Sequence, residues 1–240
     1  MTVVIQVAMP AEAAPFIAAA DSSEPVVCPL AGVDARRMRV AGQDVVLVTS
    51  GIGLVAAAAA ASWAVLTFAP RALISAGTAG GLAPASRVGD VAVGLDYSYG
   101  TADATEFDYE RGQVPGQPVR FPASDVLLDA LGALGREPGS REERDGSGTL
   151  YGRILSGDTF VTARNVADTR EAFADAVATD MESCAIAQVC RAFAVPFVSV
   201  RGVSDLCGPE AGVDHHLSVD ATSQRSADAV LAFIEKIESN

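Results

Sequence analysis

The chain has 240 residues, half of them hydrophobic, and its 17 basic and 30 acidic residues give a formal net charge of −13. This length and apolar content fit a single α/β domain over residues 1–240, and they exclude a disordered chain or a coiled coil. The negative charge excludes nucleic acid as a partner, because phosphates would be repelled and no basic patch interrupts the charge.

The N-terminal segment has neither a basic region nor a small-residue cleavage site, so residues 2–9 indicate a β-strand rather than a secretion signal. The longest apolar stretch, residues 54–70, falls short of the roughly 20 residues that a membrane span needs. We therefore expect a buried helix there, no membrane association and a cytoplasmic protein. The four cysteines lack metal-ligand spacing and are expected to be reduced and mostly buried: Cys28, Cys184, Cys190 and Cys207.

Short runs rich in Val, Ile and Leu alternate with helical patterns along the chain. Strands are expected at residues 2–9, 37–41, 44–49, 71–76, 90–95, 153–156, 176–179 and 196–203. Helices are expected at residues 11–20, 54–70, 124–134, 181–193 and 227–237. Loops are expected at residues 77–81, 97–122 and 136–149. The pattern predicts a three-layer α/β/α fold around a central twisted mixed sheet, without a linker that would divide it.

Three carboxylates follow expected strands, at the sheet edge where open α/β sheets bind ligands. They are Glu12, Glu182 and Asp205. Each also has a structural explanation, because acids in the first turn of a helix stabilise it by up to ~1 kcal/mol, and Asp205 fits a helix N-cap. Three acids on one rim of one sheet nevertheless favour a functional site.

The turn at residues 51–56 reads GIGLVA and matches a dinucleotide-binding fingerprint between a strand and a helix. The acid that should follow about twenty residues later is missing, since Arg71 stands at that position. We interpret the segment as a tight turn with close helix packing, and we expect no dinucleotide cofactor.

Seven short motifs occur in a fixed order: VIQVAMPAE (4–12), SGIGLV (50–55), SAGTAGGL (75–82), GDV (89–91), SGDTFV (156–161), DMESCAIA (180–187) and VRGVSD (200–205). In this combination the chain resembles the 5′-methylthioadenosine/S-adenosylhomocysteine nucleosidases of the nucleoside phosphorylase superfamily. The resemblance runs from residue 1 to about 237, except at residues 19–34 and near residue 140. It implies a nucleoside phosphorylase-like fold and hydrolysis of the N-glycosidic bond of methylthioadenosine, S-adenosylhomocysteine or a related 5′-modified purine nucleoside.

Cleavage of this bond builds positive charge on the ribosyl ring and negative charge on the departing purine. The reaction therefore needs an acid at the purine and a base that activates water on the opposite face of the sugar. The resemblance implies that Asp205 is the acid and Glu12 the base. It implies that Glu182 accepts the ribose diol and that Met181 forms an apolar floor under the ring. The reaction requires no metal and no cofactor.

The resemblance also implies the remaining binding positions. They line the adenine site, lie near the water and the ribose, or flank the 5′ substituent, and one of them is the serine beside the acid. They are Met9, Ile52, Thr78, Gly80, Phe160, Val161 and Ser204. Residues 103–113 resemble the family's dimer loop, which implies a homodimer in which Phe107 reaches into the partner's pocket. Ordinary interface or core packing is the alternative for Phe107.

A phosphorylase is the less favoured reading. Related phosphorylases place arginines after the first strand and just before the Ser/Thr-Ala-Gly turn, whereas this chain reads PAE at residues 10–12 and SAG at residues 75–77. Because the carboxylate of Glu12 would repel phosphate, hydrolysis is preferred. A non-catalytic nucleoside-binding protein is disfavoured by the presence of all three carboxylates.

Two departures from the family leave the 5′ substituent open. His215 replaces the aromatic residue that closes over the 5′-alkylthio group, so it is either part of a solvent-facing pair with His216 or a lid for a more polar group. Asp180 precedes Met181 where the family usually carries an apolar residue or Val-Glu, and it could be a helix cap only. Both changes keep a futalosine or aminodeoxyfutalosine hydrolase as an alternative.

Overall fold

The computed structural model describes residues 2–144 and 147–237, and within them eleven strands form one mixed sheet. The strands are β1 (Val3–Val7), β2 (Ser22–Val26), β3 (Asp34–Val40), β4 (Gln43–Thr49), β5 (Ala72–Gly81), β6 (Val91–Tyr99), β7 (Phe121–Pro122), β8 (Arg141–Arg144), β9 (Ser147–Ser156), β10 (Ala176–Asp180) and β11 (Phe197–Asp205). Their order is β10-β9-β6-β11-β5-β1-β4-β3-β2, with β7 beside β6 and β8 beside β9.

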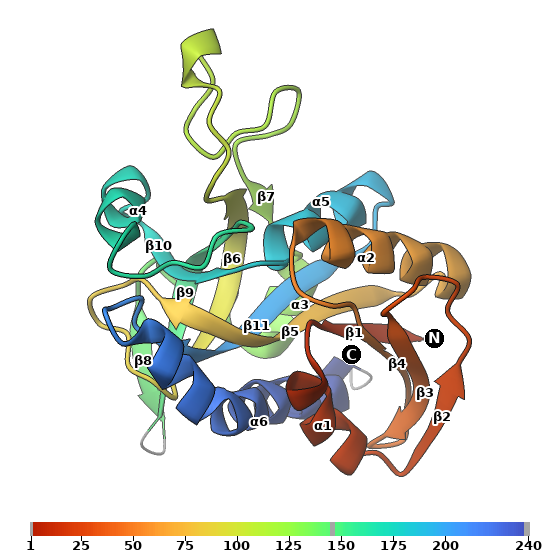
Figure 1. The fold of residues 1–240 in the computed structure, drawn as a ribbon. Coiled ribbons are helices and arrows are strands. Elements are labelled where there is room, and N and C mark those ends of the chain that lie inside the picture. The colour runs from red at the N-terminus through yellow and green to blue at the C-terminus, as the bar shows by residue number, and fades with distance from the viewer. Residues whose placement is uncertain (1, 145–146, 238–240) are drawn as a thin grey trace.

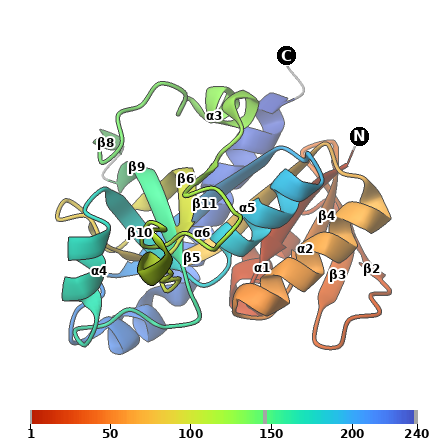
Figure 2. The ribbon, with the colours of Figure 1, turned by 90° about the horizontal axis from the view of Figure 1, so that it is seen from above.

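Helices cover both faces of this sheet (Figure 1). They are α1 (Pro10–Ala18), α2 (Leu54–Phe68), α3 (Asp125–Leu131), α4 (Val166–Ala172), α5 (Ser183–Ala192) and α6 (Ala211–Ile237). Helices α2 and α5 pack side by side over one face, as Figure 2 shows from above, and α1 and α6 pack together on the other. The predicted three-layer α/β/α fold with a mixed sheet is confirmed.

The central strands β1, β5 and β11 are buried along their whole length, as expected for parallel strands covered by helices on both faces. Their sequences are apolar apart from a few polar side chains. One of these, Gln6, donates to the Ala57 carbonyl at 2.9 Å. The others, including Ser75, Ser199 and Arg201, converge on the site described below.

Strand β5 is longer than predicted, and its extension closes part of the sheet. We expected a loop at residues 77–81, but the strand continues to Gly81 and pairs with β10 as well as β11. The loop prediction was wrong because Gly and Ala carry no side-chain periodicity, although their backbone pairs on both sides. Strands β5, β11, β6, β9 and β10 therefore form a closed ring, and Gly80 lies between Thr179 and Asp205.

The loop predicted at residues 136–149 was also wrong, since it holds β8 and the start of β9. The buried carboxylate of Asp90 anchors this hairpin, because it accepts two hydrogen bonds from Arg141 at 2.9 Å and one from the Gly148 amide at 2.9 Å. The local sequence is charged and Gly-rich, so nothing in it reveals an anchor more than fifty residues away. Strand β2 and helix α4 were likewise not predicted, and α6 begins at Ala211, before the expected residue 227.

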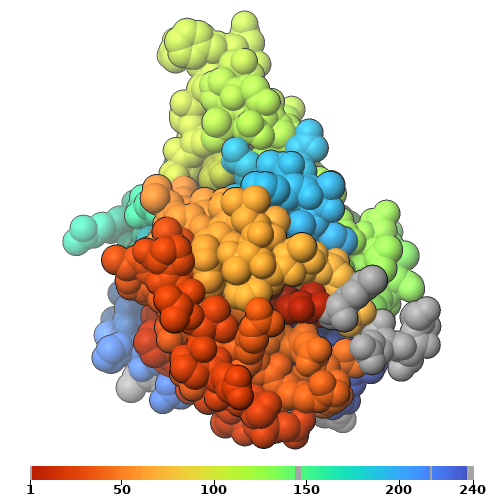
Figure 3. Space-filling view, turned by 90° about the vertical axis from the view of Figure 1, so that its right-hand side faces the viewer, coloured from red at the N-terminus to blue at the C-terminus, as the bar shows by residue number. Residues whose placement is uncertain are grey.

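Residues 100–120 leave the sheet between β6 and β7 and project as an arm, with the short 3₁₀ helix η1 (Thr105–Phe107) on it (Figures 1 and 3). The hydroxyl of Tyr99, at the base of the arm, donates to the Gln188 side chain on α5 at 2.6 Å. The side chain of Phe107 is 77% exposed. Across the described ranges, no helix combines the length and apolar character needed to cross a bilayer.

Candidate active site

A cavity of about 240 Å³ opens where the carboxyl ends of β1, β9, β10 and β11 meet the extended end of β5. Eleven of the twelve predicted site residues line it: Met9, Glu12, Ile52, Thr78, Gly80, Phe160, Val161, Met181, Glu182, Ser204 and Asp205. The twelfth, Phe107, lies on the arm, outside this lining. The structure thus brings together side chains from most of the length of the chain.

Glu12 lies in the first turn of α1, directly after β1, and its side chain is 2% exposed. One carboxylate oxygen accepts from the backbone amides of Ala8 and Met9 at 2.8 and 3.1 Å. The other accepts from the amide and the hydroxyl of Thr78 at 2.8 and 3.0 Å. A Cβ on Gly77 would fall 2.4 Å from this carboxylate, and the residue has a φ of +129°, so only glycine fits. Four donors stabilise the negative charge of Glu12.

Asp205 is the last residue of β11 and is 1% exposed, so it does not cap a helix. Its carboxylate accepts from the Cys207 amide at 2.9 Å and from the Ser204 hydroxyl at 3.0 Å. Gly80 leaves room beside it, because a Cβ there would lie 2.6 Å from the Cys207 sulfur and 3.2 Å from Asp205 Oδ1. The two buried carboxylates therefore lie in different hydrogen-bond environments, with backbone amides and Thr78 around Glu12 and with Ser204 and Cys207 around Asp205.

Glu182 lies at the N-terminus of α5, and its Oε1 accepts from the Gly53 amide at 3.0 Å. Burial raises the pKa of Glu182 to about 7; Arg201 lowers it, while Asp180 and Glu12 raise it. The ionised and neutral forms of this carboxyl are therefore balanced near neutral pH.

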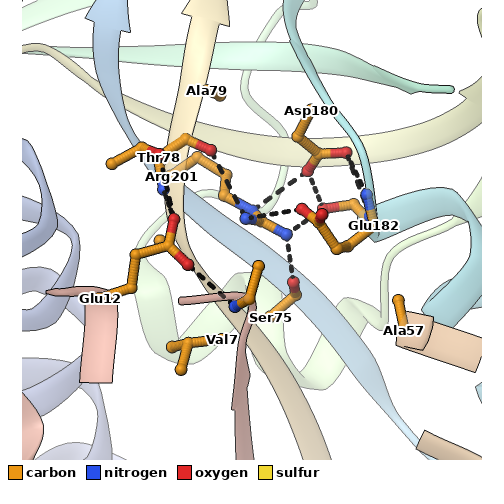
Figure 4. A network of polar contacts seen from close by, with 12 residues as sticks. Val7, Glu12, Ala57, Ser75, Thr78, Ala79, Asp180, Glu182 and Arg201 are labelled. Carbon is orange, nitrogen blue, oxygen red and sulfur yellow. Dashed lines mark hydrogen bonds and ion pairs between the residues drawn. The ribbon is translucent and has the colours of Figure 1, made fainter. Parts of the chain in front are cut away.

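Arg201 reaches from β11 into the centre of the acidic cluster (Figure 4). Its guanidinium lies 3.1 Å from Asp180 and 3.4 Å from Glu182, and it donates to Ser75 at 2.6 Å. The side chain is 1% exposed. Burial lowers the Arg201 pKa, but the surrounding carboxylates, Asp180 first among them, leave it above its ordinary value. The sequence signal for this network is a cation, Arg201, inside an otherwise apolar strand.

Asp180 is more than the helix cap considered above. It does accept from the first amides of α5, those of Glu182 and Ser183, at 3.2 and 3.1 Å. It also pairs with Arg201 and accepts from the hydroxyls of Ser156 and Ser183. Its pair with Arg201 joins the N-terminus of α5 to β11, and Asp180 also lines the cavity.

The loop after β9 carries Phe160 and Val161 into the cavity. Asp158 in this loop accepts from the Leu54 amide at 2.8 Å, at the N-terminus of α2. The preceding amide, that of Gly53, is the donor to Glu182. Two consecutive amides of one helix end therefore position both Glu182 and the Phe160 loop. Nothing local in the sequence indicates this contact, since its partners are 104 residues apart.

Several lining residues were not among the predicted site residues: Ala8, Ala79, Thr159, Thr179, Asp180, Cys207 and His215. His215 lies on α6 with its ring centroid 6.0 Å from that of Phe160. His216 is exposed and is absent from the lining, so the two histidines do not form a solvent-facing pair. Among the described residues that line the cavity, none is Lys or Arg, whereas four are acids.

The family model of the phosphorylase superfamily matches residues 2–237. A 5′-methylthioadenosine/S-adenosylhomocysteine nucleosidase of Halalkalibacterium halodurans is 38% identical over 197 residues, which cover 82% of this chain and 82% of the relative. The family-model match spans the described residues from end to end.

The solved structures that share this architecture include two nucleosidases. The nucleosidase of Neisseria meningitidis, in complex with methylthio-immucillin-A, has a TM-score of 0.89 and 33% identity, with 98% of each chain covered. The nucleosidase of Colwellia psychrerythraea, in complex with adenine, has a TM-score of 0.90 and 33% identity, covering 99% of this chain and 96% of that one.

Proposed function

The chain belongs to the 5′-methylthioadenosine/S-adenosylhomocysteine nucleosidase family of the phosphorylase superfamily, and from that premise we propose what its own residues do. The protein hydrolyses the N-glycosidic bond of methylthioadenosine, S-adenosylhomocysteine or a related 5′-modified purine nucleoside and releases the free base. The observation that carries this proposal is the pair of buried carboxylates, Glu12 and Asp205, held in different hydrogen-bond environments in one cavity.

Glu12 and Asp205 meet β5 at different positions, which suits an inverting hydrolysis. The Glu12 carboxylate contacts Thr78, whereas Asp205 pairs in the sheet with Gly80, two residues further along β5. Inverting glycosidases hold their acid and base apart, which leaves room for water between the base and the sugar.

Asp205 donates its proton to the departing purine, which neutralises the charge that develops on the base as the bond breaks. Glu12 accepts a proton from the attacking water. Three of its four donors are backbone amides that cannot move away, whereas the Thr78 hydroxyl can rotate. A water molecule can therefore share the Thr78 side of the carboxylate without breaking a backbone contact. Glu182 accepts hydrogen bonds from the ribose diol, and Met181 lies under the ring.

The charge of the cavity supports water rather than phosphate as the nucleophile. The lining contains Glu12, Asp180, Glu182 and Asp205, and the guanidinium of Arg201 already pairs with two of these acids. A phosphate dianion would meet net negative charge, whereas a neutral water would not. A phosphate-dependent phosphorylase is therefore disfavoured.

The binding of nucleoside should weaken as the pH falls through neutrality, because an ionised Glu182 accepts two hydroxyl protons and a neutral one cannot. With a pKa of about 7, Glu182 is mostly ionised at pH 8 and mostly neutral at pH 6. We expect KM to rise roughly 10-fold from pH 8 to pH 6. Steady-state kinetics across this range check the prediction, with Glu182→Gln as the matched variant whose KM is high at every pH. A KM that stays constant in the wild type would contradict it.

The 5′ substituent distinguishes the remaining alternatives. Release of free base from methylthioadenosine, S-adenosylhomocysteine, adenosine, inosine, futalosine and aminodeoxyfutalosine should be compared at equal concentration. Fast adenine release from the two thio-nucleosides, with little from the others, is the expected result. If neither thio-nucleoside releases adenine and futalosine releases hypoxanthine, futalosine is the substrate of the site. Binding of nucleosides without any release would indicate a non-catalytic protein.

A homodimer completes the proposal. Helices α2 and α5 line an apolar groove with Val55, Ala58, Val189 and Phe193, and Val55 is 79% exposed. In Figure 3 the orange surface of α2 and the blue surface of α5 adjoin beneath the yellow-green arm. A second copy on this face would receive the arm of its neighbour, and Phe107 would approach the partner's cavity.

The free thiols of the four cysteines suit a reducing cytoplasm.

Placing a charge on this face should separate the copies. In a symmetric dimer, Val55→Asp brings two like charges into the interface, which costs several kcal/mol and should weaken association at least ~100-fold. Sedimentation at micromolar concentration should then report monomers. Val126→Asp on α3 is the matched control, because Val126 is 76% exposed outside this groove. A Val55→Asp protein that stays dimeric would contradict the assigned interface.

A further inference from the structure

A chain of hydrogen bonds leads from the buried acid to a histidine on another element. His215 Nδ1 on α6 lies 3.0 Å from Ser204 Oγ, and the Ser204 hydroxyl donates to Asp205 Oδ2 at 3.0 Å. Ser204 and Asp205 are each 1% exposed, whereas His215 is partly exposed. The ring of Phe160 packs edge-to-face against the imidazole of His215. His215 is therefore the link in this chain that both touches the acid's partner and reaches solvent.

Ser204 has a single hydroxyl proton, so the protonation of Asp205 decides the direction of the hydrogen bond between Ser204 and His215. The hydroxyl has one proton to donate, and a carboxylate can only accept, so ionised Asp205 attracts the serine proton. The nitrogen of His215 that faces Ser204 must then be the donor. When Asp205 is protonated it can donate to Ser204, and the serine proton turns to His215 Nδ1 or to the Ala79 carbonyl, 3.3 Å away. The same three groups therefore form two alternative chains that differ by the direction of every hydrogen bond.

We propose that His215 and Ser204 form a proton relay that returns a proton to Asp205 after each turnover. This inference rests on the proposed function, in which Asp205 loses its proton to the purine. Protonated His215 releases the proton of Nδ1 to Ser204 Oγ while the serine proton passes to Asp205 Oδ2. The neutral imidazole then regains a proton from solvent, and Glu12 releases to solvent the proton it took from water. One proton enters and one leaves, so the enzyme returns to its starting state.

The relay acts between turnovers, which separates it from a purely structural role. The proposed function begins with a proton on Asp205, so a broken relay should leave the first turnover intact. Every later turnover should be limited by the slower return of a proton to Asp205. A residue that only shapes the cavity would instead slow the first and the later turnovers alike.

Rapid-quench measurement of adenine release from methylthioadenosine tests this difference in His215→Gln. Glutamine can still hydrogen-bond Ser204 but cannot carry a proton at neutral pH. We expect a burst close to one adenine per site at nearly the wild-type rate, followed by turnover slowed at least ~10-fold. His216→Gln is the matched control, since His216 is exposed one residue away, and it should behave as the wild type.

A second variant guards against misfolding at position 215. Ser204→Ala should also slow the later turnovers, and the double variant should be no slower in steady state than the slower single variant, because both interrupt one path. Equal slowing of first and later turnovers, or no slowing at all, would overturn the relay while leaving the proposed function standing. A wild-type protein that releases no base even in its first turnover would overturn the proposed function itself.

Discussion

Replacing Asp205 by asparagine is expected to lower the turnover of methylthioadenosine by at least ~100-fold, the usual scale for loss of a general acid. The substitution keeps the volume of the side chain. Its carbonyl can accept from the Cys207 amide, and its amide can donate to Ser204, so both contacts of Asp205 have a substitute. The proton needed by the departing purine is the feature that is lost. Steady-state release of adenine measures the effect.

The chemistry of the leaving group provides the control for Asp205→Asn. A 5-methylthioribosyl substrate whose leaving group is already acidic needs no proton, so the variant should cleave it at nearly the wild-type rate. The thermal unfolding midpoint should remain close to that of the wild type. Near-normal release of adenine by a folded Asp205→Asn protein would contradict the role of the acid.

Replacing Glu12 by glutamine is the second large effect, again at least ~100-fold in turnover. The reason is different, because this variant cannot take the proton from water. All four partners of the carboxylate are donors, so the amide of glutamine must face at least one of them. That donor conflict costs about 1–3 kcal/mol of folding free energy, which a denaturant titration measures alongside activity.

The acidic leaving group separates Glu12 from Asp205. Glu12→Gln should remain slow on the substrate that rescues Asp205→Asn, because attack by water is still required. Glu137→Gln is a suitable control for the substitution itself, since Glu137 is exposed on the surface. Rescue of both variants by the same leaving group would contradict the separate roles assigned to the two carboxylates.

The alternation of strands and helices could be predicted from sequence because apolar runs in buried parallel strands are strong signals. For the same reason the three strand-end carboxylates could be placed on one rim. Strand β5 beyond Ala76 could not, because its Gly-rich end carries no side-chain pattern, although its backbone pairs with β10 and β11. The hairpin β8–β9 was missed because its anchor, Asp90, is distant in the chain.

The sequence predicted residues that line the cavity, but it did not predict the hydrogen bonds that hold them in place. The resemblance supplied eleven side chains that do line one cavity. It did not supply the contact of Asp158 with α2, which joins residues far apart in sequence, or the contact of His215 with Ser204, which depends on how α6 turns back onto the end of β11. Such contacts depend on the tertiary packing of loops and helix ends, and no local periodicity encodes them.

The most direct test of hydrolysis by Glu12 and Asp205 follows the sugar product. Methylthioadenosine should be cleaved in ¹⁸O-labelled water, with and without 50 millimolar phosphate, roughly the concentration that would saturate a typical phosphate site. We predict equal rates of adenine release, and one labelled oxygen at the anomeric carbon of the methylthioribose. Formation of a ribosyl 1-phosphate, or release that requires phosphate, would contradict the account.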